Sequence, residues 1–331
     1  MNSIKTITIT RTFNAPRKLV FEAWLDAKHL QQWWMPRGFT NPSCVLKNTK
    51  TPGRAEQGSE LMITSYHPDF GEMPMSARYD EVLPIEKIVF STTAFPDNAG
   101  GHQLAGHNTL LFSDEGANKT KLVLTAAILK AGPGLEGALA GMDQGWAETL
   151  DRLGESVEDT SDREMHITRV VDAPRELLWK IWTEPEHIKE WWGPNGFTNT
   201  IHQFNLAPGG EWLLTMHGPD GTDYPNHIRF VEIIRNERLI YDHGRPSAVH
   251  GSADSGASVP HDQPEDGGQF RTFVNFADEG GKTRITMKGV FKTVEYKNLV
   301  VEKYGALEGQ KQHIARMEAY VANLKRAEEK R

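Results

Sequence analysis

The chain reads ITRTFNAPRKLVFEAWLDAKHLQQWWMPRGFTN over residues 9–41 and ITRVVDAPRELLWKIWTEPEHIKEWWGPNGFTN over residues 167–199. The offset between the two stretches is constant at 158 residues (167 − 9), and about half of the positions are identical. Solenoid units are much shorter than this period, so the repeat indicates two copies of a whole domain. The sequence therefore predicts a tandem duplication. The expected boundaries are 1–158 for copy one, 164–331 for copy two and 155–163 for a short polar linker.

The composition of the chain is that of a globular protein, and it excludes several functional classes. The 331 residues are 38% hydrophobic and carry a net charge of −7, so the chain lacks the basic surface that a nucleic-acid partner requires. No run of eighteen apolar residues occurs, so we expect no membrane partner. The first residues alternate like a strand and lack the apolar block of a signal peptide. Cys44 is the single cysteine and cannot form an internal disulfide, so we expect a cytoplasmic protein.

Each copy begins with a β-branched, alternating segment that predicts a strand. Ala-Pro-Arg at 15–17 and at 173–175 follows it and predicts a helix start, because proline is tolerated in the first helical turn. A second short helix ends at a Trp-Trp pair, at 33–34 and 191–192, before proline and glycine. The expected order at the start of each copy is strand, helix, helix.

Short alternating segments separated by turn residues then predict an antiparallel sheet in each copy. Apolar residues at helical spacing predict a closing helix at 142–157 in copy one and at roughly 298–326 in copy two. Residues 244–268 are rich in Gly, Ser, Asp and Pro and predict a long loop.

These motifs resemble one branch of the START-like (SRPBCC) superfamily. The resemblance rests on Ala-Pro-Arg, on Trp-Trp-x-Pro-x-Gly-Phe-Thr and on Gly145-Trp146 at the closing helix, and it covers both copies. The branch is similar to the C-terminal domain of the co-chaperone that activates the ATPase of the ninety-kilodalton heat-shock chaperone. It implies an α+β fold of two helix-grip domains, each a curved antiparallel sheet with two short helices wrapping a long C-terminal helix around a cavity.

Three functions follow from this resemblance. We expect each domain to bind a small hydrophobic molecule in its cavity without turnover, since relatives in the superfamily bind lipids, hormones or polyketides. The alternatives are a protein-interaction module that acts on a heat-shock chaperone in a stress response, and a polyketide cyclase or dehydratase. Copy two carries Gln310 where copy one carries Trp146, so the two cavities should differ in shape and polarity.

The ligand-binding candidates are large aromatic and methionine side chains, which suit an adaptable apolar wall. Trp212, Leu214 and Met216 alternate on one strand face, and the matching strand of copy one places Met62 and Tyr66 on the face opposite Leu61 and Ile63. The sequence does not say which face of each strand points inward, so these positions belong equally to a core or to a pocket. The candidates are Trp34, Met62, Tyr66, Tyr79, Met142, Trp146, Trp192, Trp212, Met216, Phe230 and Met317.

We assign no catalytic residue, metal or cofactor. The thirteen histidines show no metal-ligand spacing, and no phosphate-binding loop or nucleophile elbow occurs. If the protein is an enzyme, His243, His227 or Tyr79 would carry the proton. Asp242 precedes His243 on a strand, so the two side chains should point to opposite faces. Cys44 is expected to be a small buried apolar residue, because no basic residue flanks it.

Overall fold

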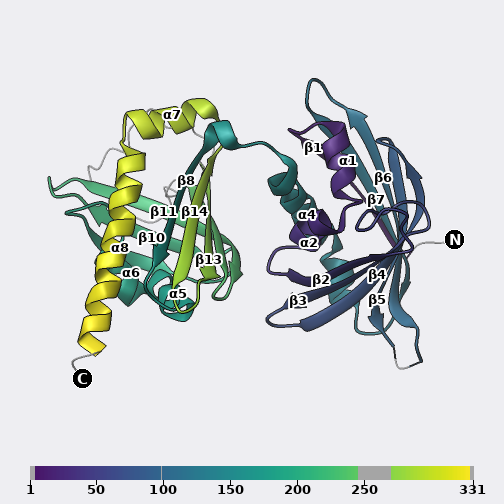
Figure 1. The fold of residues 1–331 in the computed structure, drawn as a ribbon, viewed down its shortest axis with the longest axis horizontal. Helices are drawn as coiled ribbons and strands as arrows, with labels where there is room; N and C mark the ends of the chain where they lie inside the picture. Colours follow the sequence, from purple (N-terminus) through teal and green to yellow (C-terminus); the bar gives the residue numbers. More distant parts are fainter. Residues whose placement is uncertain (1–3, 98, 245–269, 329–331) are drawn as a thin grey trace. The chain divides into compact units, whose positions relative to one another are not determined.

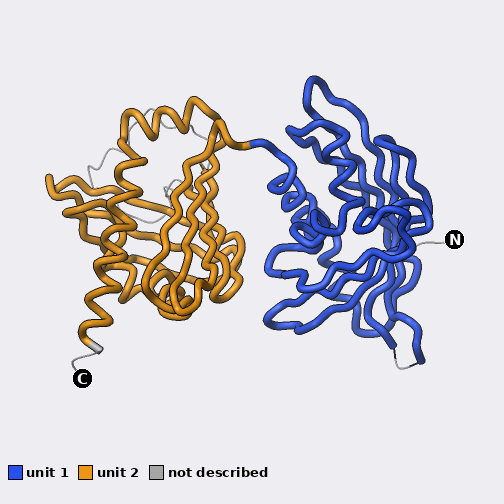
Figure 2. The backbone as a smooth tube through the Cα atoms, viewed as in Figure 1, with its two compact units in different colours: residues 1–159 blue, residues 160–331 orange. Residues whose placement is uncertain are grey.

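The structure is a computed structural model that describes residues 4–97, 99–244 and 270–328. It divides into two compact units, residues 1–159 and residues 160–331 (Figure 2). The stretch 155–163, expected to be a linker, holds the last residues of a helix that ends at Val157 and a 3-10 helix, η1 (Ser161–Arg163).

Unit 1 contains one antiparallel sheet, two short helices before its second strand and two helices at its end (Figure 1). Its elements are β1 (Lys5–Phe13), α1 (Arg17–Ala23), α2 (Ala27–Trp33), β2 (Thr40–Lys47), β3 (Glu60–His67), β4 (Gly71–Leu83), β5 (Lys87–Pro96), β6 (His102–Asp114), β7 (Thr120–Ala131), α3 (Glu136–Ala140) and α4 (Met142–Val157).

Unit 2 repeats this order after η1. Its elements are β8 (Glu164–Val171), α5 (Arg175–Thr183), α6 (Pro185–Trp191), β9 (Thr198–Phe204), β10 (Glu211–His217), β11 (Asp223–Ile234), β12 (Arg238–Gly244), β13 (Phe270–Asp278), β14 (Thr283–Phe291), α7 (Val294–Glu302) and α8 (Ala306–Glu328).

The two sheets have the same topology. Seven strands run in the order β1-β7-β6-β5-β4-β3-β2 in unit 1 and β8-β14-β13-β12-β11-β10-β9 in unit 2, so the first strand of each unit pairs with the last. Burial alternates along β7 and β14, which gives each sheet one apolar face for the closing helix. The predicted α+β fold is confirmed: each unit has one antiparallel sheet, two short helices after its first strand and a closing helix.

The core of each unit lies between that apolar face and the helices. In unit 2, Ile314, Met317 and Val321 recur at helical spacing on α8, and all three are buried against sheet and α5–α6 residues. In unit 1, Leu150 and Leu153 of α4 occupy the same place. The closing helix therefore covers the interior in both units.

The closing helix of unit 2 was predicted as one segment at 298–326, and this was wrong. The structure has α7 and α8 instead, separated at Gly305, whose φ of +61° lies in the left-handed region that glycine adopts without strain. The apolar spacing alone did not reveal the turn. The loop predicted at 244–268 lies outside the described residues except for Gly244, which ends β12.

Candidate functional site

The interior of unit 1 is filled by aromatic rings from four elements. Trp24, which follows α1, lies 4.7 Å from Trp33 and 6.0 Å from Trp34 between ring centroids. Trp146 of α4 stacks on Trp24 at 6.4 Å and meets Trp34 edge-on at 6.1 Å. Phe90 of β5 lies 6.0 Å from both Trp24 and Trp34. Trp146 and Trp34 therefore face the same interior, as expected from the sequence.

Polar groups in this interior are bonded to the protein. The indole nitrogen of Trp34 donates to the sulfur of Met75 at 3.1 Å. Tyr79 is buried, and its hydroxyl donates to the backbone oxygen of Trp24 at 2.7 Å. Burial raises the pKa of Tyr79, and the nearby thiol of Cys44 adds to the rise. A phenol held neutral and bonded to the backbone is a poor proton carrier. Met142 packs, partly buried, against the same core.

Met62 and Tyr66 do not line this interior. They are 45% and 43% exposed, whereas Leu61, Ile63 and Ser65 between and beside them are buried. Alternation along β3 puts the two sets on opposite faces, and the register of β3 with β4 aligns buried Leu61 with buried Ala77. The prediction that Met62 and Tyr66 contribute to the site was therefore wrong, because the strand presents its odd-numbered face to the core.

The interior of unit 2 centres on Trp192. Its ring lies 4.5 Å from Trp212 of β10 and 4.4 Å from His313 of α8, both nearly edge-on. Phe230 of β11 stacks on Trp212 at 6.4 Å. Met317 is fully buried, and its sulfur accepts a hydrogen bond from Trp182.

Met216 is the last inward residue of β10 and packs, partly buried, against this core. Trp212 and Phe230, predicted from the sequence, thus meet in one interior with Trp192 and Met317.

His227 faces away from the interior. Its neighbour Ile228 is fully buried and pairs with buried Trp212, so His227 projects from the opposite face of the sheet. There its Nε2 lies 3.2 Å from a carboxylate oxygen of Glu211. The prediction that His227 could carry a proton in the cavity was wrong, and the physical reason is again strand alternation.

His243 does face the interior. On β12 it lies opposite buried Ile228 of the adjacent strand β11, and its ring stacks on that of Phe270 with 3.9 Å between centroids. Its Nε2 lies 3.2 Å from the hydroxyl of Thr272. Burial lowers the pKa of His243 to about 3, although the charge of Asp242 opposes the shift.

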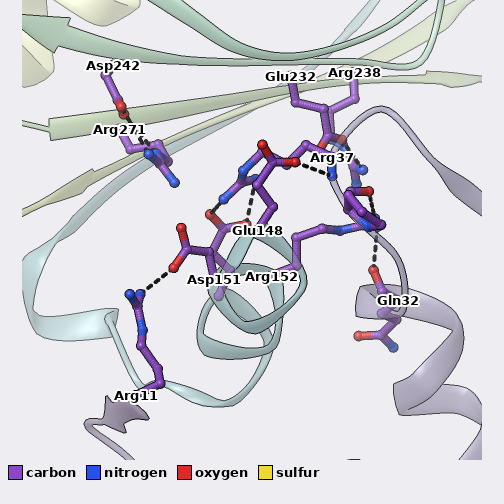
Figure 3. Close-up of polar contacts among 12 residues, drawn as sticks. Arg11, Gln32, Arg37, Glu148, Asp151, Arg152, Glu232, Arg238, Asp242 and Arg271 are labelled. Carbon is purple, nitrogen blue, oxygen red and sulfur yellow. Dashed lines mark hydrogen bonds and ion pairs between the residues drawn. The ribbon is translucent and has the colours of Figure 1, made fainter. Parts of the chain in front are cut away.

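Asp242 itself lies on the other face of β12, as expected. It forms a two-pronged ion pair with Arg271, with nitrogen–oxygen distances of 2.8 and 3.0 Å (Figure 3). It does not orient His243.

His313 is a second interior histidine, which the sequence analysis missed. Its ring lies 4.8 Å from Trp191 and 4.4 Å from Trp192. The backbone N–H of Gly193 donates to its Nδ1 at 3.3 Å. Burial lowers the pKa of His313 to about 3, and the positive charges of Arg316 and His243 add to the effect. Because Nδ1 accepts a hydrogen bond, the neutral ring carries its proton on Nε2.

Several enclosed polar atoms in unit 2 have no hydrogen-bond partner among the described residues, and three of them belong to α8 and to the strand residue Trp212. These three are Nε1 of Trp212, Oε1 of Gln310 and Nε2 of His313. Trp212 is 2% exposed, and Gln310 lies one turn before His313 on α8. Buried polar groups in folded proteins are nearly always paired, so these three atoms mark a place in this unit that calls for an explanation.

An arginine on each closing helix fixes the loop after the Trp-Trp pair. Arg152 is 6% exposed, and its guanidinium donates to the backbone oxygens of Gln32, Met35, Pro36 and Phe39. Figure 3 shows Arg152 and Gln32.

In unit 2, Arg316 donates in the same way to the backbone oxygens of residues 190 and 192–194. Gly145 and Gly309 precede these arginines by one helical repeat of seven, and a Cβ there would meet Pro36 at 3.3 Å and Pro194 at 3.6 Å. The small residue lets the closing helix approach the proline of each loop.

Alignment of the two closing helices could have revealed these residues. The pairing of Trp146 with Gln310 sets an offset of 164 residues (310 − 146), which pairs Thr149 with His313 and Arg152 with Arg316. In this alignment a histidine of copy two takes the place of a threonine of copy one, and an arginine recurs on the apolar stripe of both helices. Both features indicate positions with a role other than apolar packing. The conclusion that copy two differs in polarity rested on Gln310 alone.

The described residues contain no group of three or more His, Cys, Asp or Glu side chains that could hold a metal ion. Among the described helices, none combines the length and the apolar character needed to cross a membrane. Cys44 is half-buried, and burial together with the charge of Asp26 raises the pKa of its thiol to about 11.

The two units, each an antiparallel sheet closed by a long helix, define a tandem helix-grip protein of START-like type. A family model described as activator of Hsp90 ATPase homolog 1-like protein matches residues 14–158 and 172–322. The chain belongs to this family, and the resemblance expected from the Ala-Pro-Arg and Trp-Trp motifs is confirmed. A comparison with curated proteins finds no match.

Several solved structures are similar to the chain. A solution structure of a protein from Arthrobacter aurescens is 24% identical, covers 50% of this chain and 90% of its own, and gives a TM-score of 0.42. A crystal structure of a protein from Mycobacterium smegmatis is 25% identical, covers 49% of this chain and 91% of its own, and gives a TM-score of 0.40. The di-domain ARO/CYC protein StfQ from the steffimycin biosynthetic pathway is 14% identical, covers 96% of this chain and 99% of its own, and gives a TM-score of 0.46.

Proposed function

We propose that the chain binds a small hydrophobic molecule between the sheet and the closing helix of its helix-grip units, without turning it over. The observation that carries the proposal is the interior of unit 2, where aromatic rings contact Trp212 and His313 and where enclosed atoms of Trp212, His313 and Gln310 have no partner among the described residues. Leaving a buried donor or acceptor unpaired costs about 1–3 kcal/mol. A bound molecule that pairs with these atoms recovers that free energy, while the rings supply apolar contact area.

The absence of turnover is supported by the state of the two interior histidines. A general acid or base works best when its pKa lies near the working pH. Burial holds the pKa values of His243 and His313 at about 3, so both are neutral and weakly basic at pH 7. Of the other proton carriers considered, His227 lies on the outer face and Tyr79 is bonded to the backbone. These positions favour a binding protein over a cyclase or dehydratase.

Native mass spectrometry of the protein as purified tests the proposal. We expect an additional mass of a few hundred daltons that is lost on denaturation. Thermal unfolding with a panel of lipids and aromatic metabolites provides the second readout, because a ligand that binds only the native state must raise the melting temperature. A bare polypeptide mass together with no stabilisation by any compound of the panel would refute the proposal.

A second candidate function is interaction with a heat-shock chaperone, and the observation that favours it is the family match over both units. Such a role would use an outer surface and leave the interiors unoccupied. Its test is the steady-state ATPase rate of a ninety-kilodalton heat-shock chaperone with and without the full chain. A rate increase that survives substitution of the interior residue Gln310 by Leu supports this role, and an unchanged rate with the wild-type chain removes it.

A further inference from the structure

The three unpartnered atoms in unit 2 form a set with a definite hydrogen-bonding character. His313 carries its proton on Nε2, because Gly193 donates to Nδ1, so Nε2–H is a donor. The indole nitrogen of Trp212 is a donor only, and Oε1 of Gln310 is an acceptor. The set therefore consists of two donors and one acceptor.

The three side chains share one neighbourhood. Gln310 and His313 are three residues apart on α8 and lie next to each other on its surface. The rings of His313 and Trp212 both contact Trp192, at 4.4 and 4.5 Å between centroids. A small polar group beside Trp192 is therefore next to His313 and Trp212, and Gln310 adjoins His313 on the helix.

A hydroxyl group is the complement of this set, because it accepts two hydrogen bonds and donates one. Resting on the proposed function, we propose that unit 2 binds an uncharged hydrophobic alcohol or phenol, whose hydroxyl accepts from His313 and Trp212 and donates to Gln310. A carbonyl oxygen would leave Gln310 unpaired, and a methyl group would leave all three atoms unpaired.

A carboxylate fits the set less well than a hydroxyl. It accepts from the two donors but cannot donate to Gln310. Arg316, whose positive charge acts on His313, is already bonded to the backbone oxygens of residues 190 and 192–194. Of the hydroxyl, carbonyl, carboxylate and methyl groups compared, only the hydroxyl pairs with every member of the set.

Unit 1 does not repeat this arrangement. The residues that match Trp212, Gln310 and His313 are Leu61, Trp146 and Thr149. The hydroxyl of Thr149 donates a hydrogen bond to the backbone oxygen of Gly145.

Unit 1 does bury unpartnered indole nitrogens on Trp24 and Trp33, but its closing helix provides no counterpart of the Gln310–His313 pair. Recognition of a hydroxyl is thus specific to unit 2.

The test compares probes that differ only by hydroxyl against methyl, at three sizes: 4-ethylphenol with 4-ethyltoluene, 2-naphthol with 2-methylnaphthalene, and 2-hydroxyanthracene with 2-methylanthracene. Calorimetric titration of the full chain at pH 7 gives a dissociation constant for each. We expect the hydroxyl compound of the best-fitting pair to bind at least about tenfold more tightly than its methyl partner, because the methyl compound leaves the three atoms unpaired.

Variants identify the residues responsible. In Gln310→Leu and in His313→Thr, which copies unit 1, the ratio of the two dissociation constants, and with it the preference for the hydroxyl compound, should fall toward onefold. Thr149→Val, the matched change in unit 1, should leave the preference unchanged. Gln310→Leu removes the side-chain amide at similar volume and keeps the ring of His313, so it remains informative if His313→Thr fails to fold.

The outcomes separate the inference from the proposed function. Equal binding of both members of a pair by the wild-type chain overturns the hydroxyl inference and leaves hydrophobic binding intact. A preference that persists in both unit 2 variants also overturns it. If none of the six probes binds, hydrophobic binding itself is refuted at these sizes, and the inference falls with it.

Discussion

Acidification from pH 7 to pH 5 should destabilise unit 2 through its two interior histidines. His243 and His313 have native pKa values of about 3, below the ordinary value of 6.5, because burial disfavours the charged ring. The unfolded chain therefore binds protons in this range and the native chain does not. The stabilising contribution is fully present above pH 6.5 and is lost as the pH falls toward 3.

The size of the effect is set by the pKa of each histidine in the unfolded chain, because both rings stay unprotonated in the native chain between pH 7 and pH 5. Between pH 7 and pH 5 each histidine then contributes a loss of about 2 kcal/mol, and the pair about 4 kcal/mol. For a unit of this size, that corresponds to a fall in melting temperature of about 8–16 °C. Asp143, Asp172 and Asp220 have lowered pKa values, but from an ordinary value of 3.8, so their contribution is lost at more acidic pH.

Differential scanning calorimetry of the full chain at pH 7 and pH 5 measures the effect. The control is the double variant His243→Thr/His313→Thr, which places in unit 2 the residues that unit 1 carries as Thr92 and Thr149. We expect one transition of the wild-type chain to move by the stated amount and the same transition of the variant to move by much less. If both proteins show the same pH dependence between 7 and 5, the reasoning is refuted. Either single variant should remove roughly half of the effect.

Three further predictions concern unit 1. Arg152→Met should lower the free energy of unfolding by about 3–5 kcal/mol, because it leaves four backbone oxygens of the loop unpaired, and Arg152→Lys should lower it by less; urea unfolding measures both. Tyr79→Phe should cost about 1 kcal/mol, through loss of the hydrogen bond to Trp24, without changing ligand binding. Cys44, with its pKa raised to about 11, should react with a disulfide reagent at pH 8 about a hundredfold more slowly than an ordinary thiol, and a rate equal to that of a small-molecule thiol would contradict this.

The sequence was sufficient for the architecture because the repeat and the period-2 pattern are properties of the chain itself. The Ala-Pro-Arg and Trp-Trp motifs located the two short helices of each unit, and the structure has them at α1–α2 and α5–α6. The structure buries Trp34, Trp192 and Trp212, since a large aromatic residue on a half-apolar strand or helix is rarely left exposed, and their contact with a ligand stays a prediction.

The site was less predictable, because it depends on which face of each strand turns inward. That choice is made by packing against the closing helix, and it reversed the expectation for Met62, Tyr66 and His227. The hydrogen bond from Gly193 to His313 joins residues 120 positions apart, so no local pattern predicts it. The charge state of His243 follows from burial, which is likewise a property of the folded unit.

The two units keep the same supporting contacts and differ inside. Thr120 and Thr283 each donate a hydroxyl hydrogen bond to the backbone oxygen of the alanine in the Ala-Pro-Arg motif.

Arg152 and Arg316 each bind the loop after the Trp-Trp pair of their own unit. Asn41 and Asn199 each donate to the backbone oxygen of the second tryptophan of that pair. These contacts hold the closing helix and the short helices in place, and they involve residues at the edge of the interior.

The residues that differ lie between these supports. Phe90, Thr92, Trp146 and Thr149 of unit 1 correspond to Tyr241, His243, Gln310 and His313 of unit 2. Each change adds a polar ring or amide to the interior or removes an aromatic ring from it, and the two histidines carry the acid sensitivity worked out above. A duplicated scaffold held by contacts outside the interior can accept such changes without losing its fold. The second unit is therefore the place to look for a ligand that carries a polar group.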